Sequence, residues 1–492
     1  MLSEKSDNDN NILRINNNKL IITIKIKLIY QILLMISIFV IGYIYYVSIN
    51  EWTVFPYNSV AVPLHPLSNN NNNNNIGTAV PCNPASNHND DDQGGWKGRS
   101  PSHVPVPCIA PNCKVLCYND FTKLTESEMI QLDFELFNSD PPPLTCYRDE
   151  DNTKSKPIWF YPITFSIFPE NLVDYRCQPI KHLPFATYDP GSGYSYDWGD
   201  EEYYFRLYRD SYYAITKKKG GWDCNRHYEI MHSGTMPYFL ELENSPSRSV
   251  SFLPKKLLIE ARDLPGVSNT KEIDFNKFDK NKYYQLLQRL QYHAEKRLTT
   301  VAMANYILRT IKPLLNADGL FINTTIKTVL YIGNLETDYI KDMMLNGFYH
   351  IFGGNLTSWK GEMFQTDWPT YKPYKPGIAQ DVLKPTSFWG IGFSYNFRNY
   401  EFKEYFYRDR YIHGDVENVR NRIKNHEFDL IIYGSINRIS VFLDDLPGFN
   451  YKKSQIIMID GDDLNEWKLK RYTFAEKGIY FYRELLDDCN KL

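Results

Sequence analysis

One stretch in the middle of the chain combines lysines, glycines and acidic residues in an order that could bind an anion. It reads KKKGGW from Lys217 to Trp222 and continues into a short expected helix that begins at Asp223, a plausible N-cap. Gly234 is expected to end that helix, and residues 236–240 are expected to form a strand. A cationic turn that leads into a helix N-terminus suits a phosphate group, because free N–H groups and the helix dipole both point toward it.

The same stretch also has structural explanations that need no ligand. A buried arginine–glutamate pair, here Arg226 and Glu229, could join the helix to a sheet while the lysines form a solvated edge. His227 or His232 could contact a sugar or act as a base, and each could instead be a structural histidine whose ring nitrogens are bonded within the protein. These alternatives stay open at the level of the sequence.

Apolar runs that end in small or acidic residues recur in the last third of the chain. Residues 329–332, 428–433 and 454–460 are expected strands. Helices are expected at 337–352 and at 416–424, the latter with Asp415 as its cap, and a helical stretch at 301–311 is expected to end before Pro313. Apolar strands that alternate with helices favour a parallel α/β sheet, and such sheets bind ligands at the carboxyl ends of their strands. The residues expected at this edge, a candidate cleft, are Gly333, Gly434, Ser435, Asp460 and Asp462.

The spacing Glu229-x4-Gly234-x2-Pro237 resembles the donor-site segment of glycosyltransferases of the GT-B type. In that family the acidic residue holds the ribose of a sugar nucleotide, and the glycine lets the backbone approach the phosphates. The resemblance implies transfer of a sugar from a nucleotide-sugar donor to a glycan, protein or lipid acceptor. The residues that it assigns to donor binding are Lys219, Gly220, Arg226, Glu229 and Gly234. Arg226 and His227 would be catalytic, with Arg226 stabilising the leaving diphosphate.

The family resemblance also implies two Rossmann-like α/β domains, which would cover residues 101–316 and 325–492. In GT-B enzymes the donor motif lies in the C-terminal half, whereas here it lies in the N-terminal half. Further likeness to glycosyltransferase-like proteins of unsettled activity covers residues 428–435, 459–463 and 480–485. These segments support the fold rather than a reaction.

A short acidic motif has the spelling of a metal site. Asp460-Gly461-Asp462 resembles the Asp-x-Asp motif through which GT-A glycosyltransferases chelate Mn²⁺ or Mg²⁺. The alternative is structural, with Asp463 capping an expected helix at 464–474. We expect no cofactor and no dedicated metal site, and a divalent cation is the alternative.

The N-terminal part of the chain predicts a membrane anchor. Residues 28–47 are twenty consecutive positions without a charge, enough to cross a bilayer as a helix. Five basic residues precede them and no Lys or Arg follows before Lys97, so the positive-inside rule places residues 1–27 in the cytosol. We expect a signal anchor of a single-pass type II membrane protein, with a cleaved signal peptide as the alternative. Residues 48–100, which include an asparagine run at 69–75, are expected to form a disordered stalk.

This layout of tail, anchor, stalk and folded region is typical of Golgi glycosyltransferases, and it predicts a lumenal folded region in the Golgi or the ER. An oxidising lumen permits disulfides, which we expect in preference to a zinc site. Some of four cysteines are expected to be bonded, namely Cys108, Cys113, Cys117 and Cys146. Sequons at Asn323 and Asn355 are expected glycosylation sites.

Composition narrows the remaining choices. The formal net charge of −3 over 492 residues gives no reason to expect nucleic-acid binding, and a hydrophobic share of 43% indicates a large core. Because fold does not fix function, the alternative to an enzyme is a non-catalytic single-pass membrane protein that uses a glycosyltransferase-like fold for binding, scaffolding or adhesion. An enzyme needs the basic turn, Arg226 and Glu229 to converge on one open pocket, whereas in a scaffold Tyr or Trp side chains could fill that pocket.

Overall fold

The computed structural model describes residues 128, 131, 140–148, 156–173, 180–187, 201–322, 324–334, 338–359, 366–367, 372–373, 411–412, 415–463 and 468–491. All of these belong to one compact unit, Val104–Leu492. The expected cytosolic tail, membrane anchor and stalk lie outside the described residues, as do Asn323, Cys108, Cys113 and Cys117. Within the described ranges, no helix is both long enough and apolar enough to cross a membrane.

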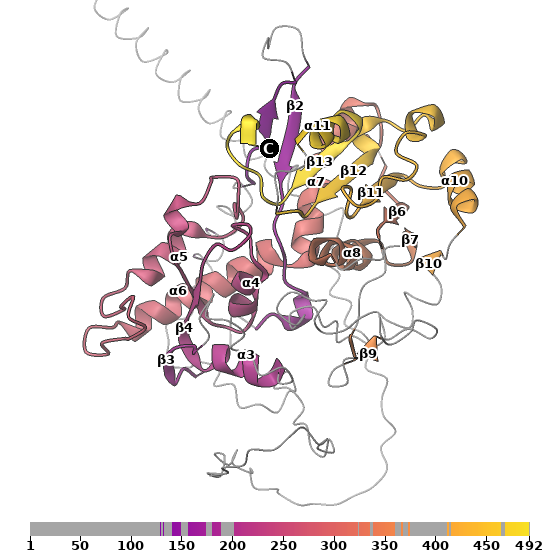
Figure 1. Ribbon diagram of the computed structural model, residues 1–492. Helices are drawn as coiled ribbons and strands as arrows, with labels where there is room; N and C mark the ends of the chain where they lie inside the picture. Colours follow the sequence, from indigo (N-terminus) through magenta and orange to yellow (C-terminus); the bar gives the residue numbers. More distant parts are fainter. Residues whose placement is uncertain are drawn as a thin grey trace, which may run out of the picture. The chain divides into compact units, whose positions relative to one another are not determined.

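An eight-stranded, mostly parallel sheet dominates the folded region (Figure 1). Seven of its strands run parallel to one another, and β1 joins the edge antiparallel to β2. In spatial order its strands are β1 (Leu144–Cys146), β2 (Ile158–Pro162), β13 (Ile479–Tyr482), β12 (Ile456–Asp460), β11 (Leu430–Tyr433), β6 (Val329–Ile332), β7 (Leu356–Trp359) and β10 (Tyr411–Ile412). The predicted α/β class is confirmed.

The order of these strands reverses direction once, beside β6. The chain adds β7 and β10 on one side of β6, and then β11, β12 and β13 on the other side. This is the order of a doubly wound, Rossmann-like sheet, and its switch point lies between β6 and β11. β2 then pairs with β13, so that a purple strand from early in the chain lies beside a yellow one from its end (Figure 1).

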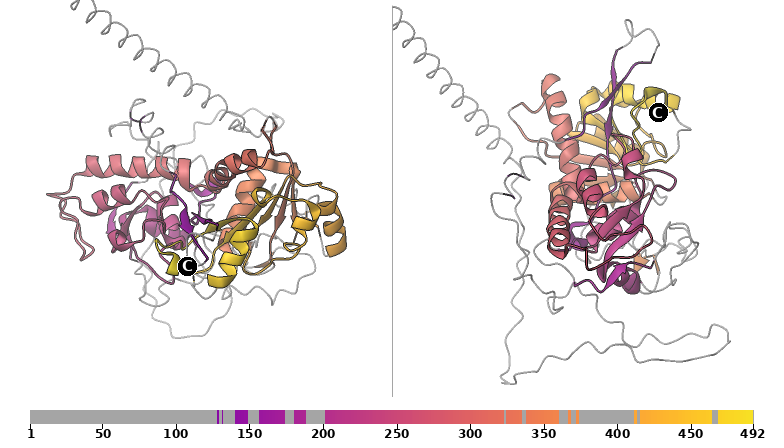
Figure 2. Two further views of the ribbon diagram at one scale, coloured as in Figure 1. Left: turned by 90° about the horizontal axis from the view of Figure 1, so that it is seen from above. Right: turned by 90° about the vertical axis from the view of Figure 1, so that its left-hand side faces the viewer.

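Both faces of the large sheet are buried, which explains why its strands are almost continuously apolar. Alternate side chains, such as Tyr331 and Ile432, pack with helices α7 (Thr300–Ala317) and α8 (Tyr339–Phe352). The intervening ones, such as Ile332, pack with α10 (Val416–Lys424) and α11 (Lys468–Lys477). Figure 2 shows the sheet from two further sides, with these helices along it.

A second, smaller sheet carries the basic stretch. Its parallel strands are β3 (Leu183–Phe185), β4 (Ser211–Thr216) and β5 (Met236–Phe239). Its helices are α3 (Glu201–Arg209), α4 (Asn225–His232), α5 (Lys255–Arg262) and α6 (Lys280–His293). One continuous cluster of buried side chains runs from this sheet through α6 and α7 to the large sheet. The division into domains of residues 101–316 and 325–492 stays a prediction. Strands β1 and β2 lie within residues 101–316 in the sequence but belong to the large sheet.

Local sequence signals located several helix ends correctly. Asp415 caps α10 by accepting from the N–H groups of Glu417 and Asn418, as predicted. One boundary differs, because α7 continues through Pro313 to Ala317 rather than ending before the proline. Ile311 and Leu315 on either side of Pro313 are both fully buried, and their burial compensates for the hydrogen bond that proline cannot make. A short antiparallel pair, β8 (Thr366–Asp367) and β9 (Lys372–Pro373), completes the described strands.

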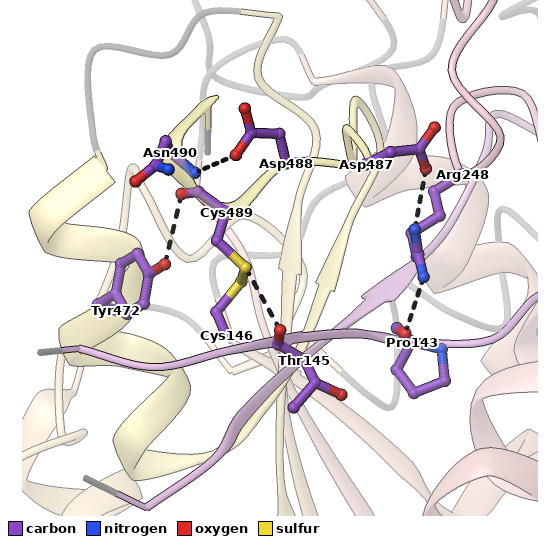
Figure 3. Close-up of a disulfide and its surroundings, with 9 residues drawn as sticks. All are labelled: Pro143, Thr145, Cys146, Arg248, Tyr472, Asp487, Asp488, Cys489 and Asn490. Carbon is purple, nitrogen blue, oxygen red and sulfur yellow. Dashed lines mark hydrogen bonds and ion pairs between the residues drawn. A yellow bond between two sulfur atoms is a disulfide. The ribbon is translucent and has the colours of Figure 1, made fainter. Parts of the chain in front are cut away.

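A disulfide joins the edge of the large sheet to the C-terminal segment. Cys146 is bonded as expected, but its partner is Cys489, which is 343 residues away (Figure 3). Cys489 belongs to the short helix η10 (Cys489–Lys491), and Cys146 ends β1. Beside the disulfide, the guanidinium of Arg248 pairs with Asp487 at 2.9 Å and donates to the carbonyl of Pro143. Both contacts hold the end of the chain against strand β1.

Removing this disulfide should destabilise the protein. Cys146→Ser or Cys489→Ser is expected to lower the free energy of unfolding by about 2–4 kcal/mol, because the bridge restricts a very long loop in the unfolded chain. Denaturant titration of the two variants measures this loss. Cys224→Ser is the control, since Cys224 is a free cysteine. Peptide mapping without reduction should recover the linked pair, and finding Cys146 and Cys489 as free thiols would contradict the assignment.

Candidate functional site

The basic turn lies against the carboxyl edge of the large sheet. The carboxylate of Glu484, just after β13, accepts hydrogen bonds from the N–H groups of Trp222 and Asp223, each at 2.8 Å. Gly221 permits this approach, because a β-carbon there would lie 2.2 Å from a Glu484 oxygen. The turn therefore does bind an anion, and in this structure that anion is the protein's own carboxylate. The lysines from Lys217 to Lys219 stay exposed.

Asp223 does not cap helix α4, and that prediction is wrong. The helix begins at Asn225, and its N-cap residue is Cys224, whose side chain makes no capping bond. The Asp223 carboxylate turns to the sheet instead, where it accepts from the backbone N–H of Phe165 at 2.7 Å and from the hydroxyl of Tyr228 at 2.6 Å. Both of these donors are buried, so a tertiary contact replaces the local one.

Arg483 is the fully buried cation at this junction. Its guanidinium donates to the backbone carbonyls of Asp223 and Gly461, and it pairs with Glu484 at 2.8 Å and with Asp463. The guanidinium carbon also lies 4.3 Å from the centre of the Phe165 ring. A buried arginine–glutamate pair does join the helical segment to a sheet, as the structural alternative predicted. It is formed by Arg483 and Glu484, not by Arg226 and Glu229.

Burial shifts the acid–base equilibria of this junction. It raises the pKa of Asp223 to about 7, although Arg483 favours the ionised form. Burial also raises the pKa of Glu484. Ionising both carboxyl groups beside a single guanidinium is unfavourable in a low-dielectric interior.

Glu229, assigned to ribose binding by the resemblance, faces a different part of the protein. Its carboxylate is buried and accepts from the hydroxyl of Tyr204 at 2.6 Å and from the amide of Asn225 at 3.3 Å. Tyr204 and Tyr208 are themselves buried and bonded through their hydroxyls. A tyrosine thus occupies one side of the Glu229 carboxylate.

His227 has the geometry of a structural histidine. One ring nitrogen, Nδ1, lies 2.8 Å from the hydroxyl of Thr216, and the other, Nε2, lies 2.9 Å from the carbonyl of Trp222. Nε2 must carry the hydrogen and donate to that carbonyl. Burial lowers the pKa of His227 to about 4, and the ring packs on Phe239. A neutral ring with both nitrogens engaged is poorly placed to act as a base.

The remaining residues of the donor-like segment divide between structure and surface. Gly234 has a φ of 72°, a left-handed conformation that suits glycine, and it ends α4 as predicted. Its carbonyl accepts from the buried ammonium of Lys181. Lys219 and Gly220 are exposed, whereas Arg226 is half-buried. A β-carbon at Gly220 would lie 2.8 Å from Asp463, so this glycine also lies at the sheet edge.

The second predicted set comes together at the switch point of the large sheet. Ser435 follows β11, and its hydroxyl donates to Asp338, the cap of α8, at 2.6 Å. Asn437 donates to both Asp460 and Asp462, and a β-carbon at Gly461 would lie 3.4 Å from an Asp338 oxygen. Residues that follow β11 and β12 thus form one polar cluster with Asp338 at the start of α8.

Several members of this cluster were not predicted. Asp338 lies at the start of α8, whereas Asn437 and Arg438 lie in the turn after β11, and their partners are distant in sequence. The guanidinium of Arg438 lies 3.7 Å from Asp338 and 3.6 Å from Asp462, and about a third of its side chain is exposed. Asn334, directly after Gly333, is buried, and neither polar atom of its amide has a hydrogen-bond partner in the part of the chain that the structure describes. The position of Asp338 before an apolar helix was a usable capping signal.

Asp460 supports the strands rather than offering a free ligand set. Its oxygens accept from Arg471 at 2.7 Å, from Tyr480 at 2.8 Å and from Asn437. Among the described residues, no group of three or more His, Cys, Asp or Glu side chains could hold a metal ion. The cap predicted at Asp463 stays a prediction because residues 464–467 lie outside the described residues, and its carboxylate pairs with Arg483.

Comparison of the chain with protein-family models, with curated proteins and with solved structures found no match.

The contacts of Glu229 predict a structural rather than a ligand-binding phenotype. Glu229→Gln should lower the free energy of unfolding by about 1.5–3 kcal/mol, the range for a hydrogen bond to a charged group, and leave nucleotide binding unchanged. Denaturant titration and nucleotide titration of the same variant measure both effects. Glu243→Gln is the control, because its exposed pair with Arg262 should contribute less than about 1 kcal/mol. Unchanged stability with weakened nucleotide binding would restore Glu229 to the donor site.

Proposed function

We propose that this chain is a membrane-anchored, glycosyltransferase-like protein that binds a nucleotide sugar at the carboxyl edge of its large sheet. The observation that supports it most is the strand order, whose switch point between β6 and β11 collects Asn334, Ser435 and Asp462. Open α/β sheets bind nucleotides at such a point, because two adjacent loops diverge there and leave a crevice. In the proposed reaction the sugar passes from its nucleotide to a glycan, protein or lipid acceptor.

Charge divides this edge into two regions. The guanidinium of Arg438 lies near both Asp338 and Asp462, so the switch point offers carboxylates to hydroxyl and amide groups and a guanidinium to a phosphate. The exposed lysines from Lys217 to Lys219 lie on the turn that Glu484 holds at the end of β13, which is separated from β11 by β12. In the transfer, cations on that turn would stabilise the negative charge that develops on a leaving diphosphate.

The second candidate is a non-catalytic binding or scaffolding protein with the same anchor and fold. It is favoured by the contacts of Glu229 with Tyr204 and of His227 with Thr216 and Trp222, which leave neither residue in the role implied by the resemblance. The two candidates differ in turnover, not in fold. A nucleotide sugar that is bound but never cleaved would favour this second candidate.

Arg438 provides the test of nucleotide binding. Nucleoside diphosphates and their sugar conjugates should raise the melting temperature of the full chain, and product assays on stabilising donors then test transfer. Arg438→Ala should weaken binding by roughly tenfold or more, since a charge-assisted hydrogen bond contributes about 1.5–3 kcal/mol. Arg422→Ala is the control, because Arg422 is equally exposed and pairs with Glu427 at the opposite edge of the same sheet. Equal affinities of the two variants would refute the switch-point site.

The secretory address has a separate test. Asn355 is exposed at the end of the short helix η4 (Gly353–Asn355), where an oligosaccharide can be attached, and the Cys146–Cys489 disulfide also suits an oxidising lumen. Endoglycosidase treatment of the expressed protein should increase its gel mobility, and Asn355→Gln should remove one glycan from the untreated protein. If endoglycosidase left the gel mobility unchanged and added protease digested the folded region in sealed vesicles, that region would lie in the cytosol.

A further inference from the structure

In the part of the chain that the structure describes, the junction between the basic turn and the large sheet contains more buried carboxyl groups than buried cations. Asp223 and Glu484 are both buried, and both face the guanidinium of Arg483. Asp463 pairs with the same guanidinium but is partly exposed. If both buried groups were ionised, one negative charge would be left without a buried counter-charge, which the protein interior strongly disfavours.

We propose that, of the two buried carboxyl groups, Asp223 retains a proton, and that this proton makes the contact between the basic turn and the sheet edge a latch that tightens as the solution becomes more acidic. The geometry provides a place for the proton. The Asp223 carboxyl oxygen lies 2.6 Å from the hydroxyl oxygen of Tyr228, which can accept from a protonated carboxyl group as readily as it can donate to a carboxylate. Glu484 then stays ionised, bonded to Arg483 and to two backbone N–H groups.

The other ionisable groups around Asp223 do not change the excess of buried carboxyl groups over buried cations at the junction. On α4, burial keeps His227 neutral at physiological pH and raises the pKa of the Tyr228 hydroxyl well above its usual value. Burial likewise raises the pKa of the Cys224 thiol to about 12. On the turn and the start of α4, the cations are Lys217, Lys218 and Lys219, which are exposed, and Arg226, which is half-buried.

From the sheet side, the charged groups are Arg483 and Glu484 after β13 and Asp463 after β12. Phe165, after β2, contributes a backbone N–H and an aromatic ring. The ring of Tyr339 on α8 packs on that of Phe165, and burial raises the pKa of the Tyr339 hydroxyl, so this group stays neutral. Among the described residues, the excess of buried carboxyl groups over buried cations therefore remains when every element packed against Asp223 is counted.

The direction of the pH effect follows from linkage. Burial raises the pKa of Asp223 to about 7 in the folded chain, above the value of about 3.9 for an unfolded chain. The closed latch therefore binds this proton more tightly than the open one. The stabilisation that the proton gives is fully present below the unfolded pKa and is lost as the pH rises through about 7. Between these two pKa values, the equilibrium constant for closing the latch should fall by up to roughly tenfold for each unit by which the pH rises.

Hydrogen exchange of the full chain tests this latch directly, because the N–H groups of Trp222 and Asp223 are bonded to Glu484. After correction for intrinsic rates, their protection should fall by up to about tenfold per unit between about pH 5 and pH 7. Asp223→Asn, which cannot ionise, should remove this dependence. Asp487→Asn is the matched control, because that carboxylate also holds the C-terminal segment, through Ser247 and Arg248, but its pKa is lowered.

Two results would overturn the proposal. One is protection of Trp222 and Asp223 in the unmodified chain that does not depend on pH. The other is a pH dependence that persists in Asp223→Asn. If Asp223→Asn does not fold, Glu484→Gln tests the proposal instead. Among the described residues, Asp223 would then be the single buried carboxyl group facing Arg483, so it should ionise more readily. The loss of protection should therefore occur at lower pH than in the unmodified chain. An unmoved profile in that variant would assign the effect to other groups.

Discussion

Arg483 lies where several segments of the chain meet, and its guanidinium contacts each of them. It bonds to the loop after β12, to the turn before α4 and to the neighbouring Glu484, and it covers the ring of Phe165 after β2. Removing one partner from such a network would leave the other charge buried without a counter-charge. The free energy of unfolding would then fall by far more than a surface ion pair contributes. Together with Glu484, which accepts from the N–H groups of Trp222 and Asp223, this side chain positions the basic turn on the large sheet.

The ends of the folded region are connected by the same arrangement. β2 comes early in the chain but pairs with β13, and β1 beside it is bonded through Cys146 to Cys489. In the sequence, the strands of the small sheet lie between β2 and β6. The segments before and after the small sheet, β1 and β2 on one side and β13 with Cys489 on the other, are therefore bonded to one another. The basic turn of the small sheet contacts Glu484, which follows β13. This connectivity accounts for a single buried cluster that spans both sheets.

The polar cluster at the switch point and the basic turn differ in what they offer a ligand. At the switch point the amide of Asn334 and the carboxylates near Arg438 offer directional hydrogen bonds. On the turn, the backbone N–H groups are already used by Glu484, so the exposed lysines contribute charge rather than a preformed phosphate cradle. A ligand that spans both regions would need hydroxyl or amide groups at one end and negative charge at the other, as a nucleotide sugar has.

The sequence by itself determined the features that depend on neighbouring residues. Apolar runs and their spacing located the strands from 329 to 460, the helices between them and the caps at Asp415 and Gly234, because each signal acts within one turn or one strand. It also predicted which residues collect at the carboxyl edge, since parallel strands share that edge. The tertiary structure alone decided that Asp223 bonds to Phe165, that Cys146 pairs with Cys489 and that Glu484 fills the basic turn. Each of these contacts joins residues 58 to 343 positions apart, and their formation depends on burial and on the path of β2 through the sheet, which no local pattern encodes.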